Sequence, residues 1–400
     1  MLEIIGLALI GIALGTVTGL VPGIHVNTVV IVLLSILPAL LNEFPAHSIA
    51  ALIVAMAIVH SYIDYIPSIF LGAPAEDSVL SVLPGHRLLL KGRGYEAVRL
   101  TVIGGVGATI FSLAMLVLVF AVLPTLYSRI IPAVPYLLTT VIAYMVLVQN
   151  RKRWLYAAIV VMLSGSLGII ILELGVINPS RALFPALTGL FGISMLYMSQ
   201  RTMLKIPVQH ITSTPVKYQK GVVIGSLAGL VSGILPSIGP SQSATIIQSL
   251  FKSGGDEKEF LVAMGGVNTA NSLYAFLALY LIGRSRSGAS IAVAEILSPL
   301  SQSDMLAIIG VTLFTTFFAA ALTLKLAKTA AAHVPKINYK KFAAATITFL
   351  IVLTILFTGP KGLLILVTAS AIGIFVQAAG VNRSTCMTIL MIPTILYFLG

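Results

Sequence analysis

Residues 15–34, GTVTGLVPGIHVNTVVIVLL, form an apolar stretch that glycine and proline interrupt at its centre. Residues 225–250, GSLAGLVSGILPSIGPSQSATIIQSL, repeat this pattern 210 positions later. In each copy small residues precede the interruption and polar residues follow it. Interrupted apolar segments at matching places in two halves indicate the binding site of a secondary transporter. The backbone groups that such a break frees must line a cavity or a ligand, because lipid cannot satisfy them.

The composition is that of an integral membrane protein. Of the 400 residues, 58% are hydrophobic and 9% are charged, and runs long enough to span a bilayer recur along the chain. The net charge of +12 lies in short loops between these runs, which is an orientation signal and argues against nucleic-acid binding. A single cysteine, Cys386, excludes an internal disulfide and a multi-cysteine metal site. The usual protease, esterase and nucleotide-binding motifs are absent, so we expect no enzyme.

The apolar runs predict an all-α polytopic membrane protein with two inverted-topology repeats of about seven transmembrane segments each. The interrupted segments would be broken helices or re-entrant hairpins. The predicted domains are a first transmembrane repeat at 1–200, a cytoplasmic linker at 201–220 and a second transmembrane repeat at 221–400. With residues 151–153 in the cytoplasm, 19 basic residues lie inside and 5 outside, which supports the inversion and places both termini outside.

A second pair of segments supports the repeat. Residues 61–72, SYIDYIPSIFLG, align with residues 272–283, SLYAFLALYLIG, at a shift of 211. The predicted spans lie near 3–21, 26–41, 48–71, 97–123, 134–149, 154–173 and 183–199, and then near 221–236, 240–251, 260–283, 304–324, 343–358, 362–379 and 385–399.

The two interruptions are candidate anion sites. Proline and glycine stop a helix, and the half-helix that follows presents unpaired N–H groups with partial positive charge. Related by the repeat, the two breaks would meet near the middle of the membrane. The alternative is a pair of proline-kinked helices packed through small residues. The substrate-binding residues predicted at the breaks are Pro22, Gly23, His25, Asn27, Thr28, Pro236, Ser237, Gly239, Ser241 and Gln242.

A second polar group belongs to the sequence GGVNTANS, residues 265–272. Asn268, Asn271 and Ser272 are spaced to share one face of a helix, so they would bind substrate or ion, or else bond to another helix. In the first half, His60 and Asp64 lie one turn apart. Asp64 is a candidate to carry a proton or bind Na⁺ as the coupling ion, unless it pairs with His60 or lies in a water-filled vestibule.

Charged residues beside the spans are candidate gates. Glu76 and Asp77 follow a span on the predicted cytoplasmic side, where they would gate or simply cap the next helix. Arg284 and Arg286 lie at the opposite mouth, where they would attract an anion or serve as ordinary flanking charges. His25 and His60 lack spaced partners for a metal. We therefore expect no metal and no cofactor apart from Na⁺ or H⁺ as a coupling ion.

The chain resembles the large membrane subunit of tripartite tricarboxylate transporters, the TctA family, in its shorter archaeal branch. The resemblance lies in the pattern G-x3-G-x2-PG, formed by Gly15, Gly19, Pro22 and Gly23, in GGVNTANS, and in PALTGLFGISMLYMS at 185–199. It covers the whole chain and implies ion-coupled uptake of carboxylates through inverted repeats. In bacterial systems it also implies a solute-binding protein and a small membrane subunit as partners. Ser232-Gly233 replaces the usual Pro-Gly in the second half, which bears on the substrate more than on the fold.

These observations predict an ion-coupled symporter of a small organic anion, of the carboxylate class, in the plasma membrane. The substrate would bind between the two breaks at the repeat interface. Beyond this anion, its partners would be membrane lipids and the two accessory proteins, with assembly into a homo-oligomer left open. The alternative is a translocase, or flippase, for an anionic lipid carrier such as a polyprenyl phosphate, whose groove would open sideways to lipid.

Overall fold

The computed structural model describes residues 2–21, 26–71, 82–149, 153–175, 177–201, 206–235, 239–240, 243, 257–336 and 338–399. All regular structure in these residues is helical. Eight of the described helices are long and apolar enough to cross a membrane, and two shorter apolar helices accompany them. These lengths and compositions indicate an integral, polytopic membrane protein.

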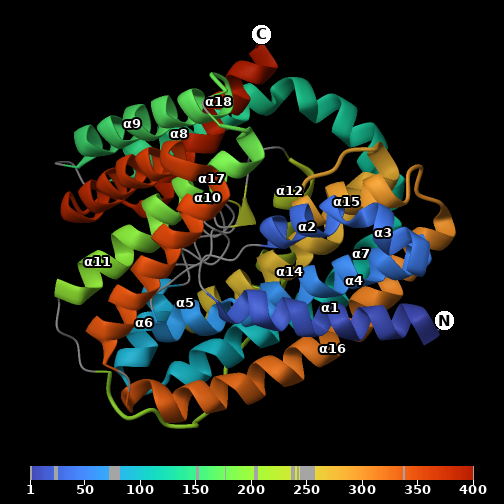
Figure 1. Ribbon diagram of the computed structural model, residues 1–400, viewed down its shortest axis with the longest axis horizontal. Coiled ribbons are helices and arrows are strands. Elements are labelled where there is room, and N and C mark those ends of the chain that lie inside the picture. The colour runs from blue at the N-terminus through green and yellow to red at the C-terminus, as the bar shows by residue number, and fades with distance from the viewer. Residues whose placement is uncertain are drawn as a thin grey trace.

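The helices gather into two bundles (Figure 1). The larger one, here called the core bundle, shares one extensive cluster of buried apolar side chains. It contains α1 (Leu2–Leu20), α2 (Val26–Ser35), α3 (Leu37–Glu43), α4 (Ala46–Ile63), α5 (Tyr65–Leu71), α6 (Val82–Leu90), α7 (Gly94–Ile130), α12 (Gln219–Ile234), α14 (Glu257–Ile282), α15 (Gly288–Ile296) and α16 (Gln302–His333).

The second bundle has its own apolar clusters and lies toward the upper left of Figure 1. It contains α8 (Val134–Leu147), α9 (Trp154–Leu172), α10 (Pro179–Leu187), the π-helical turn η3 (Thr188–Ile193), α11 (Ser194–Arg201), α17 (Tyr339–Ala378), η5 (Arg383–Met387) and α18 (Thr388–Leu399). Helix α17 is bent at Gly359, whose φ of 66° is followed by Pro360. The two spans predicted at 343–358 and 362–379 therefore form the two arms of one bent helix.

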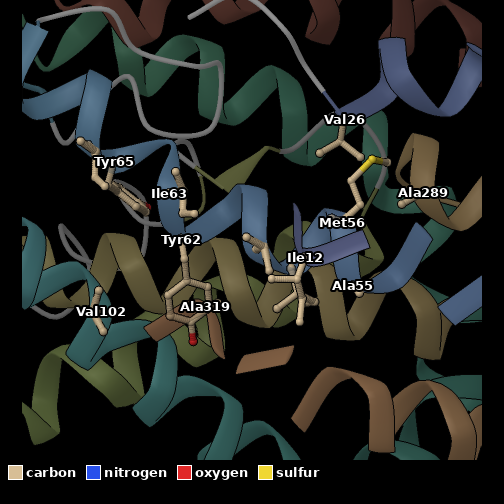
Figure 2. Close-up of a cluster of buried hydrophobic side chains, with 14 of the residues drawn as sticks. Ile12, Val26, Ala55, Met56, Tyr62, Ile63, Tyr65, Val102, Ala289 and Ala319 are labelled. Carbon is tan, nitrogen blue, oxygen red and sulfur yellow. The ribbon is translucent and has the colours of Figure 1, made fainter. Parts of the chain in front are cut away.

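A row of glycines brings α1 against α4. A Cβ atom at Gly15 would lie 2.5 Å from the carbonyl oxygen of Met56, and one at Gly11 would lie 3.0 Å from the Ala55 Cβ. Figure 2 shows Ile12 of α1 in the same region as Ala55 and Met56 of α4. Small residues of this kind let helix backbones touch, which is a main source of helix association in lipid.

The same arrangement recurs between α12 and α14. A Cβ at Gly225 would lie 2.6 Å from the Ala263 carbonyl oxygen, as Gly15 does from that of Met56. The glycines are 210 residues apart, and the carbonyls that they meet are 207 residues apart. The structural register between α4 and α14 therefore differs by one helical turn from the shift of 211 expected from the sequence.

Helices from the two halves of the chain interlock in the core bundle. Helix α7 packs along α14, while α16 packs along α4. A Cβ at Gly104 of α7 would lie 2.7 Å from the carbonyl carbon of Val262, and one at Gly265 of α14 would lie 2.6 Å from that of Thr101. Each of the two largest apolar clusters also draws side chains from both halves.

Two short turns with proline connect the bundles. The 3₁₀ turn η2 (Ile131–Ala133) joins α7 to α8, and the 3₁₀ turn η4 (Val334–Lys336) joins α16 to α17. They hold Pro132 and Pro335, respectively. Because proline removes a backbone donor, a continuous helix is disfavoured at both places.

The linker between the halves is tied to the core bundle through residues 206–218. The His210 N–H donates to the Gly92 carbonyl at 2.8 Å, and the Gly94 N–H donates to the Gln209 side chain at 2.8 Å. The buried Glu96 carboxylate accepts a hydrogen bond from the Thr214 hydroxyl at 2.5 Å. The linker therefore holds the start of α7 in place, a role that the sequence analysis did not predict.

Candidate functional site

A helix ends just before each of the two predicted breaks. Helix α1 ends at Leu20, and α12 ends at Ile234 before an extended residue, Leu235. Helix α2 begins at Val26, so Asn27 and Thr28 lie in its first turn. Gly239 accepts a backbone hydrogen bond from Ser243 at 3.1 Å. The other residues predicted at the breaks and on the cytoplasmic loop lie outside the described residues: Pro22, Gly23, His25, Glu76, Asp77, Pro236, Ser237, Ser241 and Gln242.

The His60 side chain binds α4 to α1. Its Nδ1 lies 3.0 Å from the Thr18 hydroxyl, and the residue is 6% exposed. The His60 carbonyl accepts the Asp64 N–H at 3.0 Å, which confirms their one-turn spacing on the helix. The role of His60 in ion coupling stays a prediction, and the contact with Thr18 gives its ring a structural partner.

Asp64 lies at the junction of α4 and α5. It is the C-terminal capping residue of α4 and is 3% exposed. Its carbonyl accepts the Ser68 hydroxyl at 2.7 Å, inside the first turns of α5. The next residue, Tyr65, donates its hydroxyl to the Met264 carbonyl of α14 at 2.8 Å. This bond ties the Asp64 segment to the part of α14 that precedes Asn268 by one turn.

Helix α14 carries the three polar residues predicted from GGVNTANS. Asn268 is 2% exposed, and neither atom of its amide has a hydrogen-bond partner among the described residues. Asn271 and Ser272 are half-buried, and the Ser272 hydroxyl donates to the Asn268 carbonyl at 3.1 Å. Because buried polar groups are nearly always paired, an unpaired amide needs an explanation such as a ligand, an ion or a water.

Arg286 is already engaged by the protein. Its Nη2 donates to the Tyr127 hydroxyl at 2.6 Å, and its guanidinium lies 5.8 Å from the centre of the same ring. Burial lowers the pKa of Arg286, and the nearby Arg284 lowers it further while Tyr127 opposes both. Arg284 is exposed. The structure thus separates the predicted gate pair: one arginine is held against α7 and the other faces outward.

Tyr62 is a buried residue that the sequence reasoning missed. It is 2% exposed and its ring lies against Gly105 of α7. In Figure 2 its side chain points away from Ile63. Its hydroxyl has no hydrogen-bond partner among the described residues, although three threonines from three different helices, Thr109, Thr269 and Thr316, lie near it. No local signal marks this group, because its members are far apart in the sequence.

A charged cluster at the start of α7 was also missed. The Glu96 carboxylate, which is fully buried, lies 2.6 Å from Arg93 Nη2 and 3.4 Å from Lys258 Nζ. Lys258 also donates to the Thr214 hydroxyl. Arg93 and Glu96 are three residues apart at a helix start, a spacing that could have indicated the first pair. The cluster holds α7, α14 and the linker together.

Sequence comparison with known proteins gives a family match and a relative. A family model described as "Tripartite tricarboxylate transporter TctA family" matches residues 5–388. An uncharacterized protein of Methanocaldococcus jannaschii is 30% identical over 400 residues, covering 98% of each chain. No solved structure gives a significant match.

Proposed function

The chain belongs to the tripartite tricarboxylate transporter TctA family, and from this we propose that it is an ion-coupled secondary transporter of a small organic anion of the carboxylate class. Members of the family normally work with a solute-binding protein and a small membrane subunit. The substrate binds between the two helix breaks, where the halves of the chain meet. In this proposal the protein lies in the plasma membrane, and its two halves have inverted topology.

The observation that carries the proposal is the buried amide of Asn268, which has no hydrogen-bond partner in the part of the chain that the structure describes. Leaving a polar group buried without a partner costs about 1–3 kcal/mol. An amide nitrogen donates to a carboxylate oxygen, so an anionic substrate would recover this cost. Asn271 and Ser272 extend the same polar surface and are only half-buried, which leaves them accessible to a ligand.

The two helix ends support the same location. Helix α1 ends at Leu20 and α12 at Ile234, so the chain leaves the helical path just before each of the two predicted breaks. Helix α2 begins directly after the first break, and the N–H groups of its first turn favour an anion. Small-residue packing alone explains the glycine rows, but it does not explain why both helices stop.

Transport requires the site to open to each side of the membrane in turn. The two bundles are joined by proline-containing turns, which provides a physical basis for one bundle to rock against the other. Uptake against an inside-negative potential must be driven by a cation. Each inward positive charge gains about 2.3 kcal/mol per 100 mV, so cations must at least match the charge of the substrate.

The test is uptake by the purified protein in liposomes. Labelled mono-, di- and tricarboxylates are offered with an imposed Na⁺ or H⁺ gradient. We expect uptake of at least one of them, and Asn268→Ala should lower its rate by about tenfold, equivalent to about 1.4 kcal/mol. The matched control is Ser226→Ala, which removes a buried hydroxyl that donates to the Val222 carbonyl of its own helix and should leave uptake unchanged.

Three outcomes contradict the proposal. Uptake that survives Asn268→Ala while the thermal stability falls would make the amide purely structural. An absence of uptake under every gradient, both alone and with the solute-binding protein and the small subunit, would refute carboxylate transport. Movement of a labelled polyprenyl phosphate between leaflets in the same vesicles would then identify the lipid translocase instead.

A further inference from the structure

Arg383 is a half-buried arginine of the second bundle, and its described contacts are with neutral groups. It begins η5, and its guanidinium reaches α11 and α17, which pack against each other (Figure 1). Its Nη2 donates to Gln377 Oε1 at 2.9 Å, and its Nη1 donates to the sulfur of Met195, a weak acceptor, at 3.0 Å. Arg383 forms no ion pair with any of the described residues.

The second bundle has almost no acidic residues that could balance this charge. Its segments 134–201 and 339–399 contain nine lysines and arginines but a single carboxylate, that of Glu173. Glu173 follows the end of α9, and the 19 residues of this helix place it about 28 Å from the start of α9. A charge inside a membrane protein is costly without a partner, so the counter-charge of Arg383 must come from outside this bundle.

A second arginine lies close to Arg383. Arg153 precedes the first residue of α9, and its Nη1 donates to the Gly380 carbonyl at 2.9 Å. Gly380 and Arg383 both belong to the turn of residues 379–383, here called the α17–η5 turn. Two guanidinium groups therefore flank this turn at the start of α9, and the described contacts of both are with neutral acceptors.

The helix that Arg383 contacts begins next to an irregular turn. Helix α11 follows the π-helical turn η3, whose Leu190 carbonyl accepts the Ser194 hydroxyl at 2.6 Å. A Cβ at Gly373 of α17 would clash with the same carbonyl oxygen, so α17 packs directly on this turn. The π-helical turn ends two residues before Met195. Because π-helical turns are rare and occur frequently at functional sites, this one supports a ligand beside Arg383.

We propose that the α17–η5 turn binds a phosphate group, with Arg383 as the main contact and Arg153 beside it. A guanidinium is always charged, and its planar set of N–H groups matches two oxygens of a phosphate. Gln377 and Met195 occupy two of the five N–H groups of Arg383, which leaves three without a described partner. The loop charges predict that this turn lies at the cytoplasmic surface, where the phosphate belongs to a lipid head group or to a soluble compound. This site is separate from the proposed substrate site and does not depend on which anion is transported.

The test is thermal unfolding of the purified protein in detergent. A ligand that binds only the native state raises the unfolding temperature. Inorganic phosphate is compared with chloride at equal ionic strength, and micelles with phosphatidic acid are compared with micelles with diacylglycerol, which lacks the phosphate. We expect a specific rise with at least one phosphate probe and its loss in Arg383→Gln. Lys341→Gln is the matched control, because it removes an exposed charge near the start of α17 and should keep the rise.

The two probes identify the source of the phosphate. A rise with inorganic phosphate indicates a soluble ligand, and a rise with phosphatidic acid alone indicates a lipid. If Arg383→Gln does not fold, Arg383→Lys replaces it: lysine keeps the charge without the planar donors and should need about tenfold more ligand for the same rise. A rise that Arg383→Gln leaves unchanged, an unchanged affinity in Arg383→Lys, or no specific rise with either probe would overturn the proposal.

An internal carboxylate is the alternative counter-charge for Arg383. Glu76, Asp77 and Asp256 lie outside the described residues. Double-mutant cycles on the unfolding temperature therefore combine Arg383→Gln with Glu76→Gln, Asp77→Asn or Asp256→Asn. We expect additive effects, because a bound phosphate and not these residues balances the arginine. Strong non-additivity in one of the cycles would identify an internal ion pair and would contradict the phosphate site.

Discussion

Tyr62 is a buried polar side chain at a place where four helices meet. Its ring lies on Gly105 of α7, and its hydroxyl meets threonines from α7, α14 and α16. No water is available in a packed membrane interior to replace a lost partner. The Thr109 and Thr269 hydroxyls donate to carbonyls of their own helices, whereas the Tyr62 and Thr316 hydroxyls have no hydrogen-bond partner among the described residues.

We expect Tyr62→Phe to raise the free energy of unfolding by up to about 1 kcal/mol, because it removes a buried hydroxyl that has no hydrogen-bond partner among the described residues. The measurement is reversible unfolding of the purified protein in detergent. Tyr136→Phe is the matched control, since Tyr136 is 68% exposed and should change stability little. Equal effects of the two substitutions would contradict a specific role for Tyr62.

The contrast between Asn268 and Tyr62 shows what sequence can reveal about a site. Asn268, Asn271 and Ser272 belong to one helix, so their spacing predicted a shared face, and the structure places Asn268 in the interior. Tyr62 and its threonine neighbours come from four helices, and only the packed structure brings them together. Whether the predicted residues bind substrate stays a prediction, because their spacing fixes a face of the helix and no ligand.

At the scale of helices, glycines let the backbones of α7 and α14 come into direct contact. Gly104 faces the backbone of Val262, and Gly265 faces that of Thr101. We expect Gly104→Ala to lower the free energy of unfolding by about 1–3 kcal/mol, because the added methyl group would force the two helix backbones apart. The measurement is thermal unfolding in detergent.

Gly310→Ala provides the control for this substitution. Gly310 lies in the interior of α16, and a Cβ there would meet nothing within 4 Å. Alanine is a better helix former than glycine by about 1 kcal/mol, so this variant should be as stable as the wild type or more so. A neutral effect at Gly104 would show that the helices can separate without cost.

The sequence predicted the ends of α1 and α12 better than it predicted the alignment of α4 with α14. Glycine and proline marked where α1 and α12 end to within a few residues, because these residue types act on the local backbone. The shift of 211 between α4 and α14 was one turn too long. Both segments are apolar and lack a regular marker, so a one-turn slip changes their sequence similarity little, whereas the glycines of α1 and α12 fix the register through contact.

For the whole molecule, the interlocking of the halves predicts their behaviour when separated. Co-expressed fragments 1–212 and 213–400 should purify together, because α7 packs on α14 and α16 packs on α4. The cut leaves Gln209 in the first fragment and Thr214 in the second, so each keeps its contact with the core bundle. Co-purification through a tag on one fragment is the measurement.

The glycine contacts supply the controls for this experiment. Gly104→Leu in the first fragment should abolish co-purification by blocking the contact with α14. Gly310→Leu in the second fragment should leave it intact, because that position is open. Fragments that fold separately and do not associate would contradict the interlocked arrangement. The sequence could not predict this arrangement, since composition and loop charges determine which segments cross the membrane and not which of them touch.

The interlocked packing also has a consequence for biosynthesis. The glycine surface of α7 enters the membrane about 160 residues before its partner on α14, since Gly104 is made long before Gly265. At about 5–20 residues per second, the nascent chain spends roughly ten to thirty seconds with this surface uncovered. During that interval Glu96 also lacks Lys258, one of its two cationic partners. The first half must therefore wait in the bilayer as an incomplete structure, protected by lipid or by the insertion machinery, until translation delivers the helices that complete it.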